Sequence, residues 1–152
     1  MTPYRAKDPF DWPGLLAVIR RAFAGMEGRI DPPSSLHRLT ADGIANQART
    51  GEVWVIGAPP VACVFLTPKP DVLYIGKLAV DPAHLRQGHA RQLLDLAAAR
   101  ASALSLPALE LQTRIELSEN HAIFRRLGFI QTGSSAHEGY DRPTTLTFRR
   151  AL

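Results

Sequence analysis

Residues 74–94 read YIGKLAVDPAHLRQGHARQLL and predict a strand, a turn and the start of a helix. The short apolar run up to Val80 favours a strand. Pro82 ends it, because the proline ring removes a hydrogen-bond donor and restricts the preceding residue to extended backbone. A helix is expected next, because apolar residues recur at helical spacing. These residues are Leu93, Leu94, Ala97, Ala98 and Ala101, and the outer face is expected to carry Arg91, Asp95 and Arg100.

The turn before this helix is suited to hold an anion. The first turn of a helix leaves backbone N–H groups unpaired and carries a partial positive charge. Gly88 has no side chain to block a close approach, and Ala90 is almost as small. Arg86 adds a fixed charge and His89 a further hydrogen-bond donor. A pyrophosphate fits such a helix entrance, and an ordinary tight turn is the alternative interpretation.

The segment resembles the central motif of the GNAT acetyltransferases, Arg/Gln-x-x-Gly-x-Gly/Ala behind a strand that ends in Val-x-Pro. The matching residues are Val80-Asp81-Pro82 and Gly88-His89-Ala90, whereas Leu85 replaces the leading Arg or Gln. The sequence has no Walker-type phosphate loop and no Gly-x-Gly-x-x-Gly dinucleotide loop. The resemblance implies acetyl-CoA as the cofactor, with its pyrophosphate bound mainly by backbone groups. The implied binding loop consists of Leu85, Arg86, Gln87, Gly88, His89, Ala90 and Arg91.

The order of predicted elements is also the order found in that family, so the resemblance covers most of the chain. Strands are expected at 4–6, 52–56, 61–67, 72–80, 108–113, 129–132 and 144–149. Helices are expected between Asp11 and Gly25, between Thr40 and Gly51, after Gly88, and from a Ser118 cap to Gly128. The helix between the fourth and fifth strands makes these two strands parallel neighbours. The predicted fold is α/β, a GNAT-like three-layer fold with a mixed sheet of about six to seven strands and about four helices.

The resemblance also assigns residues to the acyl-carrying arm of the cofactor. In this family the fourth and fifth strands diverge and the pantetheine enters between them, which implies that backbone groups of Leu78, Ala79 and Val80 pair with it. A second family signature places an Asn shortly before an aromatic residue and Gly-Phe. Asn120 and Phe124 match it here, ahead of Gly128-Phe129. Asn120 is therefore expected near the thioester, and a polar residue in the first turn of a helix is its alternative role.

The usual proton-transfer residues of the family are missing. Gln112 stands where many relatives carry a glutamate base, and Phe124 stands where many carry a tyrosine acid. The predicted catalytic residues are Tyr74, Asn120 and Tyr140, with Glu110 acting through water as a further substitute; a structural role is the alternative for each. The ordinary pKa of tyrosine, near 10, favours Tyr74 as a proton donor. A reaction without a dedicated base also stays open, because positioning alone supplies much of the rate.

Composition limits the remaining classes of function. At 152 residues with 45% apolar content, the chain is expected to form a single domain, residues 1–152. The net charge of +4 fits an anionic cofactor, and no block of Lys and Arg indicates a nucleic-acid interface. Cys63 is the only cysteine, which excludes an internal disulfide, and no histidines stand at metal-ligand spacing, so no metal is expected. Neither a signal peptide nor a membrane span is visible, so we expect a cytoplasmic protein.

These observations predict an N-acetyltransferase that passes an acetyl group from acetyl-CoA directly to an amine of a small molecule or protein. Four cationic residues are expected to line the acceptor cleft and to favour an acceptor with a carboxylate: Arg29, Arg114, His137 and Arg142. A catalytically silent acyl-CoA-binding or sensor domain stays open, as does a basic nucleic-acid-binding module. The oligomeric state also stays open, with a homodimer as one form.

Overall fold

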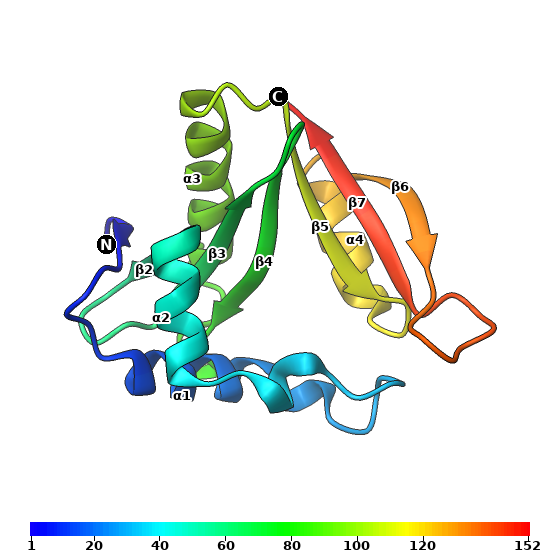
Figure 1. The fold of residues 1–152 in the computed structure, drawn as a ribbon, viewed down its shortest axis with the longest axis horizontal. Coiled ribbons are helices and arrows are strands. Elements are labelled where there is room, and N and C mark those ends of the chain that lie inside the picture. The colour runs from blue at the N-terminus through cyan, green and yellow to red at the C-terminus, as the bar shows by residue number, and fades with distance from the viewer.

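The computed structural model describes all residues, 1–152, and contains one seven-stranded mixed sheet with four α-helices (Figure 1). The strand order is β1-β2-β3-β4-β5-β7-β6. The strands are β1 (Tyr4–Arg5), β2 (Glu52–Ile56), β3 (Ala62–Pro68), β4 (Leu73–Val80), β5 (Ala108–Arg114), β6 (Ile130–Ser135) and β7 (Thr145–Ala151). The helices are α1 (Trp12–Phe23), α2 (Ala41–Thr50), α3 (His89–Ala103) and α4 (Ser118–Arg126). The predicted α/β fold class and the parallel pairing of the fourth and fifth strands are confirmed.

Local capping signals explain where the first two helices begin. The side chain of Asp11 accepts a hydrogen bond from the N–H of Gly14, and the hydroxyl of Thr40 accepts one from the N–H of Gly43, both at 3.0 Å. Each bond satisfies one of the amides that a helix start leaves unpaired. For α4 the predicted cap at Ser118 is wrong. Ser118 is already the first residue of the helix, Leu117 occupies the N-cap position, and no side chain caps the helix.

The helices cover the two faces of the sheet unequally. One apolar cluster joins α1 and α2 to β2, β3 and the end of β4, whereas a second cluster joins α3 to β3, β4, β5 and β7 on the opposite face. Leu109 and Leu111 of β5 are buried in the second cluster. Side chains alternate along a strand, so Glu110 and Gln112 face the other way. No helix covers them there, and a polar sheet face remains open beside α1 and α2.

The parallel strands β4 and β5 separate soon after they begin. They pair only over residues 73–75 and 109–111, and beyond these residues they diverge into a V (Figure 1). A β-bulge accounts for the divergence: on β4, Gly76 and Lys77 together face the single residue Phe65 of β3. A bulge bends and twists the strand that carries it, which turns the end of β4 away from β5.

The connection between α1 and α2 crosses to the far arm of this V. We call residues 29–33 the strap. The two amino groups of the Arg114 guanidinium, at the end of β5, donate to the carbonyls of Pro32 (2.6 Å) and Pro33 (3.1 Å). The N–H of Asp31 donates to the Glu116 carboxylate at 3.0 Å. The strap thus joins the α1–α2 side of the molecule to the β5–β7 side.

The hairpin loop between β6 and β7 holds the strap from outside. The Tyr140 hydroxyl donates to one carboxylate oxygen of Asp31 at 2.6 Å, and Arg142 donates to the other at 3.1 Å. Arg29 forms an ion pair with Glu119 at 2.6 Å. All these side chains lie near solvent, so each contact alone contributes little to stability, and the contacts hold the strap only as a group.

A buried ion pair ties α3 to β2. Arg100, expected on the outer face of its helix, instead turns its guanidinium onto Glu52, with both carboxylate oxygens accepting at 2.8 and 2.9 Å. The Glu52 side chain is only 6% exposed and also accepts from the indole of Trp54 at 2.7 Å. Burial alone would raise the pKa of Glu52, but the hydrogen bonds from Arg100 and Trp54 outweigh it and lower that pKa.

The variant Arg100→Ala should lower the free energy of unfolding by about 3 kcal/mol, because it leaves the buried Glu52 carboxylate without its cation. Urea unfolding followed by circular dichroism measures the loss. Arg126→Ala, at an exposed arginine without a partner, should change stability by less than about 0.5 kcal/mol. Equal effects of the two variants would contradict this account of the pair.

The variant Asp31→Ala should loosen the strap without unfolding the protein, because it removes the acceptor of both Tyr140 and Arg142. Trypsin should then cleave after Arg29 several-fold faster than in the parent chain, as expected where local opening becomes easier. Mass spectrometry of the early fragments identifies the cleaved bond. Asp141→Ala, at an exposed neighbour on the same hairpin loop, is the matched control, and an unchanged rate in Asp31→Ala would show that Asp31 does not hold the strap.

Candidate functional site

The loop that precedes α3 has an unusual backbone. Gly88 is the residue before the helix and adopts the left-handed conformation, with φ at 81°. Arg86 does the same, with φ at 62°. A non-glycine residue in this region is uncommon and costs free energy, and such residues concentrate at functional sites. A Cβ added at Gly88 would meet nothing within 4 Å, so the space before the helix is open. The loop presents the free amides of a 15-residue helix to solvent.

The side chains of this loop point in two directions. Leu85 is 57% exposed, and Arg86, Gln87 and Arg91 are exposed as well. His89 is buried instead: its Nε2 lies 3.1 Å from the Gln87 side-chain oxygen, and its Nδ1 has no partner. The structure therefore leaves the backbone amides and the two arginine side chains accessible to solvent, while the ring of His89 is buried against Gln87.

The peptide groups of β4 beyond the bulge alternate between β3 and the gap of the V. The N–H of Asp81, which follows β4, donates to the carbonyl of Val61 at 2.8 Å. Hydrogen-bonding direction alternates along a strand, so Ala79 also directs its peptide groups to β3, and Leu78 and Val80 direct theirs to the opposite side. β5 has already diverged on that side, so the gap is bordered by backbone donors and acceptors that have no strand partner.

The two predicted residues of α4 are four positions apart, so they lie on the same face of the helix, one turn from each other. The side-chain amide of Asn120 is half-buried and makes no hydrogen bond, although its backbone N–H donates to Leu117 at 3.0 Å. Phe124 packs against the core, with its ring centroid 6.0 Å from that of Phe129 and 6.3 Å from that of Phe148. The Asn120 amide is thus free to bind a ligand, and Phe124 packs against the core while its side chain stays only partly buried.

The open sheet face beside the paired end of β4 and β5 carries a row of polar groups. The Tyr74 hydroxyl lies 3.5 Å from the side-chain oxygen of Gln112, whose amide lies 3.4 Å from the Thr147 hydroxyl. Burial raises the pKa of the Tyr74 hydroxyl, and the negative charge of Glu110 raises it further. Tyr74 is therefore protonated near neutral pH and is a hydrogen-bond donor. The carboxylate of Glu110 itself accepts a hydrogen bond from the guanidinium of Arg149 at 3.0 Å.

The residues expected around the acceptor cleft are held by other protein groups. Arg29, Arg114 and Arg142 bind the strap or its neighbours, as described above. The ring of His137 contacts the Thr144 hydroxyl. The hydrogen bond to Asp31 raises the pKa of the Tyr140 hydroxyl, and burial adds to the effect. Tyr140 and the three arginines hold the strap in place, so none of these arginines is left without a protein partner.

One cation at the gap was not singled out from the sequence. Lys77 lies on the bulge of β4, half-buried, and makes neither a hydrogen bond nor an ion pair in the structure. Burial lowers the pKa of its ammonium group, and the charge of Arg114 lowers it further. A single lysine inside an otherwise apolar strand is the sequence signal that could have found it.

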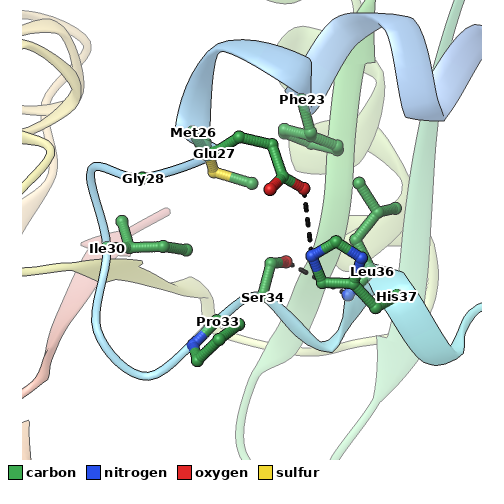
Figure 2. Close-up of a pocket in the computed structure, with 9 residues that line it drawn as sticks. All are labelled: Phe23, Met26, Glu27, Gly28, Ile30, Pro33, Ser34, Leu36 and His37. Carbon is green, nitrogen blue, oxygen red and sulfur yellow. Dashed lines mark hydrogen bonds and ion pairs between the residues drawn. The ribbon is translucent and has the colours of Figure 1, made fainter.

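A separate hollow of about 150 Å³ lies between the end of α1 and the α1–α2 connection (Figure 2). The Nε2 atom of His37 lies 3.0 Å from the Glu27 carboxylate across its edge, and the Ser34 hydroxyl accepts from the N–H of Leu36 at 3.1 Å. Apolar side chains supply the rest of its lining: Phe23, Met26, Ile30, Pro33 and Leu36. None of the residues predicted to bind the cofactor lines this hollow.

The structure also bears on three other possibilities, namely a metal site, a membrane-spanning helix and a reactive cysteine. No group of three or more His, Cys, Asp or Glu side chains could hold a metal ion. No helix has both the length and the apolar composition needed to cross a membrane. Cys63 is completely buried, and burial raises the pKa of its thiol to about 12. The thiol is therefore not available as a nucleophile at neutral pH.

Solved structures with the same fold include several acetyltransferases. The ribosomal-protein-S18-alanine N-acetyltransferase of Escherichia coli superposes with a TM-score of 0.75 at 17% identity, covering 99% of this chain and 92% of that one. A GNAT family acetyltransferase of Elizabethkingia anophelis with acetyl-CoA bound gives 0.67 at 16% identity, covering 99% and 97%. The PaiA N-acetyltransferase of Thermoplasma acidophilum, in complex with coenzyme A, gives 0.73 at 14% identity and covers both chains fully, 100% and 100%.

Sequence comparison is more specific about the family. A search of curated proteins gives no significant match. The profile of the acetyltransferase (GNAT) family, in contrast, matches residues 17–129, a range that begins in α1 and includes the bulge of β4, the Gly88 loop and α4. This match covers well over half of the sequence, and acetyl-CoA is the cofactor of the family. The chain belongs to the GNAT family of acetyltransferases.

Proposed function

We propose that this chain, acting as one domain over residues 1–152, transfers the acetyl group of acetyl-CoA directly to an amine. The observation that supports this most is the gap between β4 and β5, where Leu78 and Val80 direct unpaired peptide groups. An extended pantetheine arm carries amides that can pair with such groups as an added strand would. The gap leads to the Gly88 loop, where the pyrophosphate would bind the amides at the start of α3.

Backbone groups hold the cofactor in this proposal, and few side chains assist. The left-handed residues Arg86 and Gly88 give the loop its shape, and the exposed side chains of Arg86 and Arg91 supply positive charge. The N–H of Leu78 is the first peptide donor beyond the bulge that faces the gap, which suits it to bind the thioester carbonyl as negative charge develops there. The free amide of Asn120 would orient the pantetheine near the same point.

Proton transfer depends on a donor for the leaving thiolate. Tyr74 is protonated and lies on the open face at the paired end of the V, so we assign it this role. Tyr140 would reach the reaction only after releasing Asp31, which makes it the second candidate. We assign no protein base: Gln112 cannot accept a proton near neutral pH, and the acceptor would react through its neutral fraction once positioned. The buried Cys63 leaves direct transfer as the route.

A catalytically silent acyl-CoA-binding domain is the second candidate function. The observation in its favour is the absence of a carboxylate at Gln112 and of a hydroxyl at Phe124. Release of free thiol from acetyl-CoA, measured with a panel of small amines and N-terminal peptides, separates the two. Turnover with any amine above the hydrolysis rate supports the transferase, whereas tight binding without turnover across the panel supports the silent domain.

The variant Gly88→Leu should weaken binding of CoA and acetyl-CoA by about tenfold or more, because a side chain there strains the left-handed backbone and obstructs the anion. Isothermal titration calorimetry measures both affinities. Gly139→Leu is the matched control, because Gly139 is also left-handed, with φ at 84°, and its Cβ would also meet nothing within 4 Å, but it lies in the β6–β7 hairpin loop. An equal loss in both variants, or no loss in Gly88→Leu, would contradict the proposed binding loop.

A further inference from the structure

We propose that Lys77 is a site of self-acetylation, at which its ε-amine takes the acetyl group from acetyl-CoA bound in the same chain. The inference rests on the proposed function, since it needs acetyl-CoA in the gap between β4 and β5. It adds a modification site within the protein itself. The chain offers few alternatives, because it contains only three lysines, Lys7, Lys69 and Lys77.

The position of Lys77 along β4 places it next to the expected thioester. It occupies the bulge where β4 leaves β5 and directly precedes Leu78, whose N–H faces the gap. Consecutive Cα atoms lie about 3.8 Å apart, so the flexible four-carbon stem of the lysine can bring its amine to a carbonyl bound at Leu78. Gly76, the residue before it, has no side chain to stand in the way.

The side of the sheet to which Lys77 points follows from its neighbours. Leu78 and Val80 pack with the cluster beneath α3, whereas Ala79 packs with the cluster beneath α1 and α2. Alternation along the strand therefore turns Lys77 toward the α1–α2 side. Phe65, which faces Lys77 across the bulge, belongs to that same cluster. The amine thus approaches the gap from the side on which the strap lies, away from α3.

The surroundings of Lys77 favour its neutral, nucleophilic form. It is half-buried, no carboxylate pairs with it, and the charge that acts on it is the guanidinium of Arg114, which is itself held by the strap carbonyls. Desolvation and a neighbouring cation both disfavour an ammonium ion. Lys69 differs, because it is exposed and lies over the ring of Tyr74 at 4.2 Å, and Lys7 is exposed at the start of the chain.

The chemical step needs no further reactant. The lone pair of the neutral Lys77 nitrogen attacks the thioester carbonyl carbon, a C–N bond forms and the C–S bond breaks. The nitrogen loses one proton, and the departing CoA thiolate takes one up, so the products are N-acetyl-lysine and free CoA thiol. The modification would remove a positive charge from the strap side of the gap and place an amide there.

The test uses the purified full-length chain with acetyl-CoA that carries a deuterated acetyl group. Peptide mapping by mass spectrometry follows the label at each lysine over time. We expect Lys77 to gain label about tenfold faster than Lys7 or Lys69, because Lys77 lies on the bulge beside the bound thioester, whereas Lys7 and Lys69 are exposed. Its rate constant should not change with protein concentration, as required for transfer within one chain. Lys77→Arg should abolish this fast labelling, and Lys7→Arg should leave it unchanged.

Two controls separate failure of this inference from failure of the proposed function. In urea the three lysines should react at similar rates, because the folded site is lost. Binding of acetyl-CoA to the same sample is measured by calorimetry. Binding together with labelling of Lys77 no faster than of Lys7 and Lys69 would overturn the self-acetylation inference alone. Absence of binding would overturn the proposed function, and this inference with it.

Discussion

The arrangement of this protein depends on the β-bulge of β4, where two residues of β4 face a single residue of β3. Gly76 and Lys77 share Phe65 as their partner, and this extra residue bends β4 away from β5 after three paired residues. A Cβ at Gly76 would lie 3.4 Å from that of Phe65, in ordinary van der Waals contact, so the bend does not depend on glycine at this position. The peptide groups beyond the bulge are then left without a strand partner. Such groups are costly unless water or a ligand satisfies them, and an extended ligand can do so.

The divergence also explains why the rest of the chain is arranged as it is. The helices α1 and α2 cover the β1–β4 arm, and α3 lies behind both arms, so the face of β5 and β7 beside the gap stays open. The strap closes part of that opening through Arg114 and Asp31. The cofactor would enter at the α3 end of the gap, and the acceptor would meet it on the strap side.

The sequence predicted those features that local signals determine. The caps at Asp11 and Thr40 and the turn at Pro82 depend on nearby residues, and the structure has them where they were expected. The burial of Leu93, Leu94, Ala97 and Ala101 also follows from spacing alone. The bulge and the strap depend on residues far apart in the chain, such as Asp31 and Tyr140, and no local pattern indicates them. Arg100 was misplaced for the same reason, since its partner Glu52 lies on another element.

The central claim is that backbone groups of β4 beyond the bulge bind an extended ligand. Residue-resolved hydrogen exchange by NMR tests it directly, with the chain measured alone and with saturating acetyl-CoA. The account predicts that the amides of Leu78 and Val80 exchange markedly more slowly in the complex, while that of Ala79, directed to β3, changes little. Binding of acetyl-CoA without added protection at Leu78 and Val80 would contradict it.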